Sequence, residues 1–428
     1  MSRNAFEDIP GHPFGDMQLI RLDNPVRNYA WGSRTTIAAL QGRPFPTTEP
    51  EAEIWIGAHP AAPSRVTART DLLAAIEADR SGILGPERDR LPFLLKVLAV
   101  AKPLSIQVHP DSQQAVCGFT REESLGIPRD DPTRNYRDDW PKPELLYAVT
   151  DFDALCGIRE PRDAARLLRD LPGERLQRIA GVLEERGPGE TFDLLNSWPI
   201  NDRRALVAEV RIGGTQARMG ETEARMGESE ARMGESEVRM GGPEAALRAA
   251  ARIAADQPDD PGCVTSLLLN LVTLTPGQAL YARPRTIHAY LHGTAVEIMA
   301  SSDNVLRGGL TPKHVDQAEL AAVADFTPTK PEVIEPVTLP TGEEMYPAPV
   351  EQFQLTRLRP RPLITIPDPG PSAILGLVGS LTVTRGDTTH LLNPGEALFA
   401  PHNGDNKLTI GGQGLGFRAS IPTFPATG

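Results

Sequence analysis

A seven-residue motif occurs twice in this sequence. Residues 276–282 read Pro-Gly-Gln-Ala-Leu-Tyr-Ala, and residues 394–400 read Pro-Gly-Glu-Ala-Leu-Phe-Ala. In each copy a Pro-Gly turn leads into a short apolar run, and another proline follows soon afterwards. A turn-and-strand unit of this kind is typical of the corners of jelly-roll barrels, and a repeated unit indicates a repeated architecture. The sequence therefore predicts two β-barrels.

The segments around the two copies differ in their apolar spacing. Apolar runs of four to eight residues, broken by Pro and Gly, predict strands in 17–159 and 263–326. Between them, residues 160–262 have apolar positions at helical spacing. We therefore predict a mainly β chain: two jelly-roll barrels of the cupin type, with an α-helical domain inserted into the first.

The remaining segments are predicted from composition. Residues 1–16 are rich in Gly, Pro and Asp and are expected to be disordered, and Met17 is an alternative start to Met1. Residues 327–349 are rich in proline and are interpreted as a linker to a C-terminal barrel at 350–428. Residues 215–242 form a tandem heptad repeat with a glycine in every unit. We interpret the repeat as a flexible surface loop, with a partner-binding helix as the alternative.

Composition excludes several classes of protein. The 428 residues carry a formal net charge of −12, which disfavours nucleic acid or an anionic membrane surface as a partner. The three cysteines are widely spaced, so neither a disulfide framework nor a thiolate zinc site is indicated. There is no stretch of 18 consecutive apolar residues. We therefore expect a cytoplasmic protein without a membrane partner.

Lysine is unusually rare in this chain. It has 44 Lys and Arg residues, of which only six are lysines: Lys96, Lys102, Lys142, Lys313, Lys330 and Lys407. Because arginine supplies most of the positive charge, a lysine is expected where a compact, titratable ammonium is needed.

Four residues from distant segments suit a metal site. Gln107 and His109 are two apart, so on a strand their side chains would share one face. His288 follows the first copy of the repeated motif, and Glu144 begins an apolar run between these segments. Two imidazole nitrogens and two oxygens are suitable ligands for a divalent ion such as Zn²⁺.

Positive charges lie close to these positions in the sequence. Lys142 comes two residues before Glu144, Lys96 ends the apolar run LPFLLK, and Arg307 and Lys313 bracket the segment RGGLTPK. A metal with several fixed cations suits an anionic substrate, most simply a small phosphorylated molecule.

Taken in order, several strings resemble one family. These are NPVRNYAWGS, AEIWIGAHPAAPS, PFLLKVLAVAKPLSIQVHP, PKPELLYA, IHAYLHG and VEIMASSDNVLRGGLTPK. They are similar to type I mannose-6-phosphate isomerases of the cupin superfamily. The resemblance implies one Zn²⁺ per chain, bound by Gln107, His109, Glu144 and His288, and a catalytic role for Arg307. It also implies that phosphate and sugar are faced by Ser105, Lys96, Lys142, Glu297 and Lys313.

The activity that this resemblance implies is the interconversion of D-mannose 6-phosphate and D-fructose 6-phosphate through a cis-enediol, in carbohydrate metabolism and GDP-mannose biosynthesis. Glu297, a water on the zinc ion, or Lys142 with a lowered pKa could each act as the base, and the sequence does not choose among them. A monomer is expected.

Two alternatives from other classes remain. A non-enzymatic cupin that binds a sugar phosphate would keep the pocket without catalysis, but Arg307 and all four ligands are present. Another metal-dependent cupin enzyme, an epimerase or a dioxygenase, is the second alternative. A dioxygenase would favour two histidines and one carboxylate around iron, and Gln107 as a fourth ligand argues against it. The C-terminal barrel has no Gln-x-His string and is expected to be non-catalytic.

Overall fold

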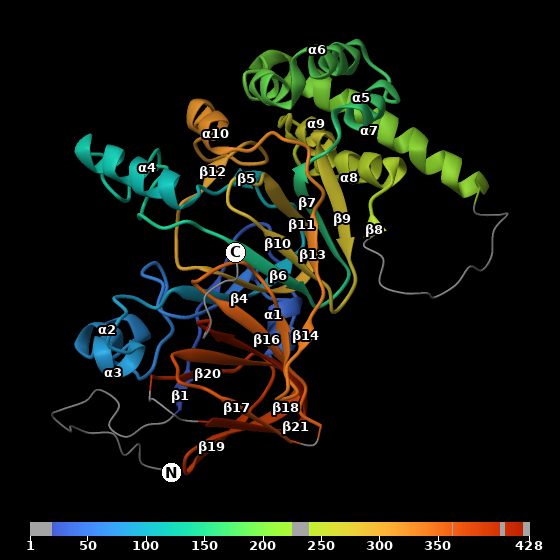
Figure 1. Ribbon diagram of the computed structural model, residues 1–428. Coiled ribbons are helices and arrows are strands. Elements are labelled where there is room, and N and C mark those ends of the chain that lie inside the picture. Colours follow the sequence, from blue (N-terminus) through green and yellow to red (C-terminus); the bar gives the residue numbers. More distant parts are fainter. Residues whose placement is uncertain (1–18, 225–238, 362, 403–406, 423–428) are drawn as a thin grey trace. The chain divides into compact units, whose positions relative to one another are not determined.

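The computed structural model describes residues 19–224, 239–361, 363–402 and 407–422 (Figure 1). The chain divides into two compact units, each assembled from segments that are distant in sequence. Unit 1 comprises Met1–Leu98, Val296–Ser301 and Glu335–Gly428, and unit 2 comprises Ala99–Ala295 and Ser302–Ile334. Strands run through both units, so the prediction of a mainly β chain is confirmed.

The strands of unit 2 are mostly short and pair antiparallel. β5 pairs with β11 and β12, β7 with β11 and β9, β8 with β9, and β10 with β6 and β13. Their bounds are β5 (Gln107–Val108), β6 (Glu144–Ala148), β7 (Phe152–Ile158), β8 (Arg239–Met240), β9 (Leu269–Leu274), β10 (Ala279–Ala282), β11 (His288–Ala300, of which the last residues belong to unit 1), β12 (Leu306–Arg307) and β13 (Glu332–Ile334).

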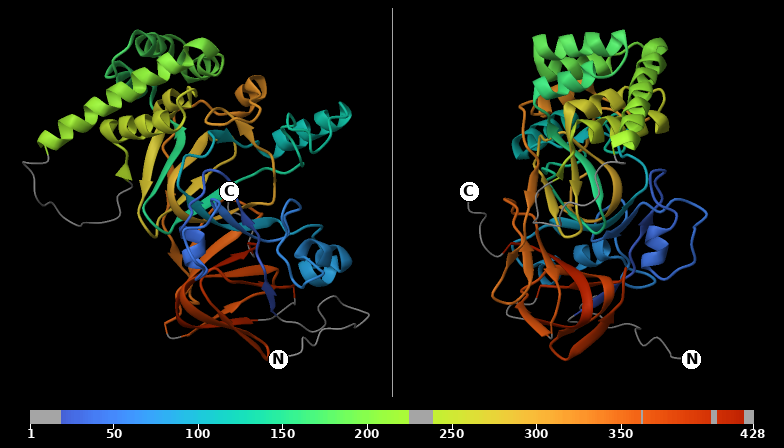
Figure 2. Two further views of the ribbon diagram at one scale, coloured as in Figure 1. Left: turned by 180° about the vertical axis from the view of Figure 1, so that it is seen from behind. Right: turned by 90° about the vertical axis from the view of Figure 1, so that its right-hand side faces the viewer.

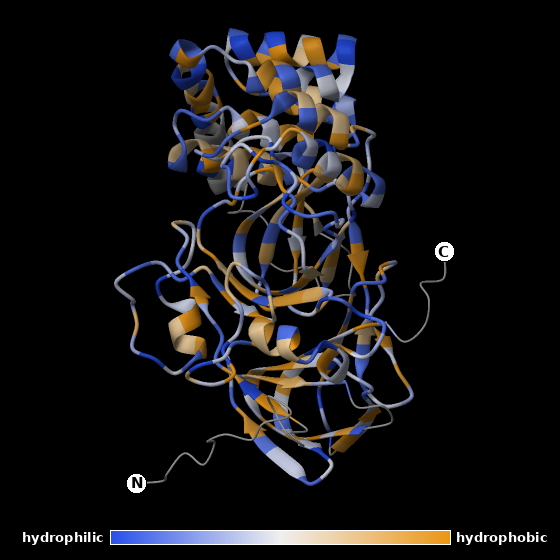
Figure 3. Ribbon diagram, turned by 90° about the vertical axis from the view of Figure 1, so that its left-hand side faces the viewer, coloured by the Kyte–Doolittle hydropathy of each residue, from blue (hydrophilic) through white to orange (hydrophobic). Residues whose placement is uncertain are grey.

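The long helices of the described chain also belong to unit 2 (Figure 2). They are α4 (Ser112–Ser124), α5 (Pro161–Arg169), α6 (Glu174–Asn196), α7 (Ile200–Ala224) and α8 (Pro243–Asp256), with the shorter α9 (Gly262–Thr265), η1 (Ser266–Leu268) and α10 (Gln317–Val323). Hydrophobic and hydrophilic residues alternate around the helices (Figure 3). In α5, for example, Ala164, Leu167 and Leu168 are buried while arginines remain exposed. The helices predicted within 160–262 are therefore present, and they share one hydrophobic core with strand residues such as Val108 and Leu306.

The described residues of unit 1 form a second group of strands and three short helices. β18 lies between β20 and β21, and further pairings add β1, β16, β15, β14, β17 and β19, while β3 pairs with β2 and β4. The strand bounds are β1 (Ile20–Leu22), β2 (Val26–Arg27), β3 (Glu53–Ile56), β4 (Phe93–Val100), β14 (Val337–Thr338), β15 (Glu344–Tyr346), β16 (Gln354–Leu358), β17 (Leu363–Pro367), β18 (Ser372–Arg385), β19 (Thr388–Leu392), β20 (Ala397–Ala400) and β21 (Lys407–Ser420). The helices are α1 (Thr36–Leu40), α2 (Leu72–Ala78) and α3 (Arg80–Leu84).

Two segments differ from the sequence-based expectation. The heptad repeat is predicted as a flexible loop with a helix as the alternative; α7 extends through its first residues to Ala224, and β8 lies near its end. The repeat is rich in Ala, Arg, Met and Glu, which favour a helix strongly enough here to outweigh the glycines. Residues 225–238 of the repeat, like the segment 1–16, lie outside the described residues.

The supposed linker at 327–349 contains three strands, β13, β14 and β15. β13 pairs with β10, and β15 pairs with β14 and β16, so its backbone groups are satisfied by ladder hydrogen bonds. Its prolines lie outside these short strands, where the missing N–H costs no ladder bond. Proline content alone therefore predicted less regular structure in this segment than is observed.

The two copies of the repeated motif fold into the same turn. Gly277 and Gly395 both have positive φ, +109° and +79°, a conformation that glycine adopts readily. The N–H of Gly277 donates to the carbonyl of Ala148 (3.0 Å), and the N–H of Gly395 donates to the carbonyl of Gly376 (2.9 Å). β10 then pairs with β6, and β20 pairs with β18. The sequence repeat thus corresponds to a structural repeat, one copy in each unit.

Candidate active site

Three strands of unit 2 carry predicted site residues in one cross-strand row. Gln107 of β5 lies opposite His288 of β11 on one side and opposite Arg307 of β12 on the other. Directly opposite residues of antiparallel strands project to the same face of the sheet. An imidazole, an amide and a guanidinium are therefore presented side by side.

His109 is positioned by the end of its strand. β5 ends at Val108, and α4 begins three residues after His109 with a capping box formed by Asp111 and Gln114. The carbonyl of His109 accepts a hydrogen bond from the N–H of Arg285 (2.7 Å). The backbone of His109 is thus fixed between a strand, a capped helix and the segment that leads into His288.

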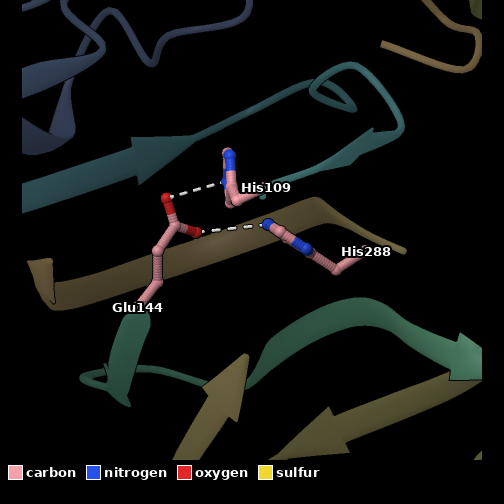
Figure 4. Close-up of side chains that lie close together, drawn as sticks. All are labelled: His109, Glu144 and His288. Carbon is pink, nitrogen blue, oxygen red and sulfur yellow. Dashed lines mark hydrogen bonds and ion pairs between the residues drawn. The ribbon is translucent and has the colours of Figure 1, made fainter. Parts of the chain in front are cut away.

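Glu144, His109 and His288 converge on one point (Figure 4). One ligand atom from each lies within 4.8 Å of the others, and all three residues are buried. Nε2 of His109 is 3.2 Å from Oε1 of Glu144, and Nε2 of His288 is 3.2 Å from Oε2. Ligands held at about 2.0–2.2 Å by a tetrahedral ion lie about 3.3–3.6 Å apart, so the observed spacing is close to that of a metal site.

The hydrogen bonds of the two imidazoles also fit a metal. Nδ1 of His109 donates to the carbonyl of Asn304 (2.7 Å), and Nδ1 of His288 donates to the carbonyl of Thr286 (2.9 Å). In a neutral ring this leaves a lone pair on Nε2, facing the Glu144 carboxylate. Two electron-rich atoms at this distance repel each other unless a cation lies between them. The buried Nε2 of His109 indeed has no hydrogen-bond partner.

Electrostatics favour the protonation states that metal binding needs. Burial, followed by the nearby charge of Lys142, lowers the pKa of His109 to about 4, which keeps the imidazole neutral. Burial alone would raise the pKa of Glu144, but the nearby charge of Lys142 is the largest of the influences that hold that pKa well below its ordinary value. Nζ of Lys142 lies 2.8 Å from Oε1 of Glu144. The cluster therefore offers neutral nitrogens and an ionised carboxylate.

A group of cations lies beyond the row. Burial and then the charge of Arg137 lower the pKa of Arg307, and burial, Arg307 and Arg137 lower the pKa of Lys313. The charges of Arg137, Arg307 and Lys313 thus act on one another, and the carboxylate of Asp303 offsets part of this repulsion. Arg137 was not among the predicted residues, although it stands in the string NYRDDWPKPE, five positions before Lys142.

Two further predicted residues lie together in unit 1. Nζ of Lys96 is 3.1 Å from Oε2 of Glu297, and both side chains are buried. Lys96 lies opposite Trp55 in the β3–β4 register, and its ammonium is 5.5 Å from the centroid of the indole. Trp55 was missed by the sequence reasoning, although it stands in one of the strings that carried the resemblance.

The last predicted residue, Ser105, belongs to unit 2. It is half-buried and precedes β5, two positions before Gln107. The His109–Glu144–His288 group, the cross-strand row and the three cations are thus in unit 2, and the Lys96–Glu297 pair is in unit 1.

Comparison with known proteins identifies the family to which this chain belongs. The family model for the catalytic domain of type I phosphomannose isomerase matches residues 19–161. The mannose-6-phosphate isomerase of Salmonella typhimurium is 37% identical over 416 residues, covering 94% of this chain and 98% of that protein. The mannose-6-phosphate isomerase of Escherichia coli is 37% identical, covering 92% and 97%. This chain belongs to the type I phosphomannose isomerase family.

Solved structures agree. The apo form of mannose 6-phosphate isomerase from Salmonella typhimurium superposes with a TM-score of 0.80 at 32% identity, covering 95% of this chain and 99% of that one. A mannose 6-phosphate isomerase bound with zinc and yttrium gives the same TM-score and identity, covering 95% and 100%. The prediction that the chain belongs to this family is therefore confirmed, and so is the prediction that it is a mannose-6-phosphate isomerase. Within the described part of the chain, no helix is long and apolar enough to cross a membrane.

Proposed function

We propose that this protein is a zinc-dependent aldose–ketose isomerase that interconverts D-mannose 6-phosphate and D-fructose 6-phosphate through a cis-enediol. The observation that carries the proposal is the buried His109–Glu144–His288 group, in which both Nε2 atoms face a carboxylate. The names of the 37% identical relatives supply the substrate, and the zinc in one solved relative supports the metal.

The zinc ligands in this proposal are His109, Glu144, His288 and Gln107. The register of β5 and β11 supports Gln107, because it projects to the same face as His288. When bound, zinc supplies a Lewis acid that polarises the sugar oxygens beside the reacting carbons. The rest of the chemistry falls to the side chains of the chain.

Isomerisation moves one proton between neighbouring carbons. The C2–H bond of the aldose breaks, O1 gains a proton, and the enediol forms; then C1 gains a proton while O2 loses one, which leaves the ketose. Negative charge develops on oxygen in both steps. Arg307, fixed beside Gln107 in the row, is proposed to stabilise that charge with its planar guanidinium.

The phosphate requires an anchor away from the reacting carbons. Lys313 is exposed to solvent, and the charges of Arg307 and Arg137 act on it; we assign the phosphate to Lys313 with Arg137 as a second cation. Anchoring there would orient the sugar, and such binding energy lowers the barrier by positioning. An anion bound here would offset the repulsion among the cations, which favours a doubly charged phosphate.

The base that carries the proton stays one of the three candidates named from the sequence, of which one is a water and two are side chains. Lys142 is held by Glu144 at 2.8 Å, and Glu297 is held by Lys96 at 3.1 Å. For Lys96, Glu297 and Ser105, the resemblance implies roles in facing the sugar or its phosphate, and these roles stay predictions. The finer fold is also a proposal: two cupin-type barrels with a non-catalytic C-terminal one, supported by the shared turn of the repeated motif.

The decisive experiment is a coupled assay. Purified protein is supplied with mannose 6-phosphate, and fructose 6-phosphate is followed through NADPH formation by auxiliary enzymes. Activity should disappear after dialysis against a chelator and return with Zn²⁺, while the circular dichroism spectrum stays unchanged. Full turnover by protein with less than about 0.05 metal per chain would refute zinc dependence. Absence of turnover by zinc-loaded protein would refute the substrate.

A further inference from the structure

Asn304 is a buried asparagine whose hydrogen bonds join three parts of the proposed site. It is fully inaccessible to solvent and lies between β11 and β12. Its Oδ1 accepts from the N–H of Arg137 (2.8 Å) and of Asp138 (3.2 Å). Its Nδ2 donates to the carbonyls of Asp138 (2.8 Å) and Trp140 (2.9 Å). The side-chain amide thereby uses both its donor hydrogens and its acceptor oxygen on one backbone segment.

The segment that Asn304 holds leads directly into the site. Residues 137–140 precede Lys142 and Glu144 by a few positions, and Arg137 itself belongs to the group of three cations. The backbone carbonyl of Asn304 accepts the Nδ1–H of His109 (2.7 Å), which directs Nε2 of that ring towards Glu144. Asn304 thus fixes the tautomer of His109 and the position of the backbone segment that leads to Glu144.

Neighbouring bonds reinforce the same junction. Oγ of Ser302 donates to the carbonyl of Trp140 (3.2 Å), and the N–H of Asp303 donates to Oδ2 of Asp138 (2.8 Å). Oδ1 of Asp138 in turn accepts from the N–H of Trp140 (3.0 Å). The loop at 302–304 and the segment 137–140 are therefore held as one network, and Arg307 follows three residues after Asn304.

We propose that Asn304 is a positioning residue for the metal centre: it sets the orientation of His109 and the placement of the segment leading to Lys142 and Glu144. The inference rests on the proposed function, because the centre is taken to bind zinc. It assigns Asn304 no contact with substrate. Partners that orient metal ligands typically contribute 10–100-fold to metal affinity.

The variant Asn304→Asp tests this role with little change of shape. The new carboxylate keeps the acceptor for Arg137 and Asp138, but it places an oxygen where Nδ2 donated to two carbonyls. Those carbonyls would be pushed away, and with them the segment before Glu144. We expect Zn²⁺ affinity, measured by competition with a chromophoric chelator, to fall 10–100-fold, and the visible spectrum of the Co²⁺-substituted protein to change.

Asn270 provides a matched control in the same unit. It is also buried, and its Nδ2 donates to the carbonyls of Gly157 (3.2 Å) and Thr329 (2.8 Å), among others. None of its bonds reaches a proposed ligand side chain or the segment 137–140. Asn270→Asp should therefore lower the melting temperature of the metal-free protein as Asn304→Asp does, but change Zn²⁺ affinity by less than about threefold.

The outcomes separate the inference from the function. Wild-type affinity in folded Asn304→Asp, or an equal loss in both variants, would overturn the positioning role while the zinc proposal stands. If wild-type protein bound no divalent ion, both would fail together. Should Asn304→Asp not fold, Asn304→Ser keeps a small polar side chain without the amide, and the same comparison with Asn270→Ser decides the question.

Discussion

The two copies of the repeated motif lie at matching positions in the two units, but the residues that pair with them differ in chemistry. In unit 2 the last residue of β10, Ala282, pairs with Glu144, and in unit 1 the last residue of β20, Ala400, pairs with Ser372. The residues before these partners correspond as well, Lys-Pro-Glu in one unit and Gly-Pro-Ser in the other. Where unit 2 has a buried carboxylate beside two imidazoles, unit 1 has a buried hydroxyl.

Unit 1 instead carries buried charge that is paired within itself. Asp368 accepts from Nη1 of Arg418 (3.0 Å), and Arg385 donates to the backbone carbonyls of Pro401 (2.7 Å) and Asp368 (3.1 Å). All three charged residues are buried. The comparison teaches that the same turn and strand pairing can support a ligand cluster or a closed ion-pair cluster, depending on a few residues at the strand ends.

The largest effect is expected where the two copies differ most. Glu144→Gln removes the only proposed anionic ligand, and loss of the Lewis acid should lower kcat by about 10³-fold or more. The matched change in the other copy, Ser372→Ala, should leave kcat within about twofold. Steady-state kinetics with metal analysis of both proteins measures this. Comparable losses in the two variants would mean that the copies are not functionally distinct.

The converse test breaks the ion-pair cluster of unit 1. Asp368→Asn removes the carboxylate that pairs with two buried guanidinium groups, of which Arg418 keeps Glu343 at 3.6 Å and Arg385 loses its carboxylate partner. Breaking a buried pair typically costs about 3–5 kcal/mol of unfolding free energy. Urea denaturation gives the change. Zinc content and kcat of the folded variant should remain those of wild type, and a loss of bound zinc would contradict the separation of the two clusters.

A smaller effect is expected for Arg307, which completes the row in unit 2. Because its charge acts mainly in the transition state, Arg307→Ala should lower kcat about 10²–10³-fold with little change in KM. Arg307→Lys should not restore the rate, since a point charge lacks the planar fork. If kcat stays at the wild-type value and only KM rises, Arg307 is a phosphate anchor.

The smallest effect concerns Lys313 and depends on pH. Lys313→Ala should raise KM about tenfold with a lesser loss of kcat, as expected for one lost charge-assisted hydrogen bond. Burial, Arg307 and Arg137 lower the pKa of Lys313, so its positive charge is lost at a lower pH than for an ordinary lysine. The KM of wild type should therefore rise in the alkaline range, and the KM of Lys313→Arg should not. Identical pH profiles would argue against this assignment.

The sequence predicted the proposed ligands better than it predicted the residues that hold them in place. Spacing and strand logic brought together His109, Glu144 and His288, and the scarcity of lysine pointed to Lys96 and Lys142, both of which are buried beside carboxylates. The repeated motif predicted a repeated turn, because a Pro-Gly pair restricts the backbone locally. Such signals either depend on residues close together in the sequence or concern residue types that have few other roles in this chain.

The residues and strands that hold the site in place could not be predicted in the same way. The role of Asn304 depends on bonds to residues more than 160 positions away, and asparagine is common in loops for many reasons. Likewise, the strands within 327–349 exist because β10 and β16 offer partners, which the segment itself does not reveal. Long-range pairing decides such features.

The spacing of the proposed ligands along the chain has a consequence for biosynthesis. Glu144 and His288 are 144 residues apart, so the ribosome releases the first three proposed ligands long before the fourth. A nascent chain that ends before β11 lacks His288, the support from Asn304, and the closed loop that brings these residues together. Zinc that binds only the completed unit adds RT ln(1 + [Zn²⁺]/Kd) to its stability and nothing to earlier intermediates. Metal capture is then a late event, and zinc selects finished molecules over partial ones.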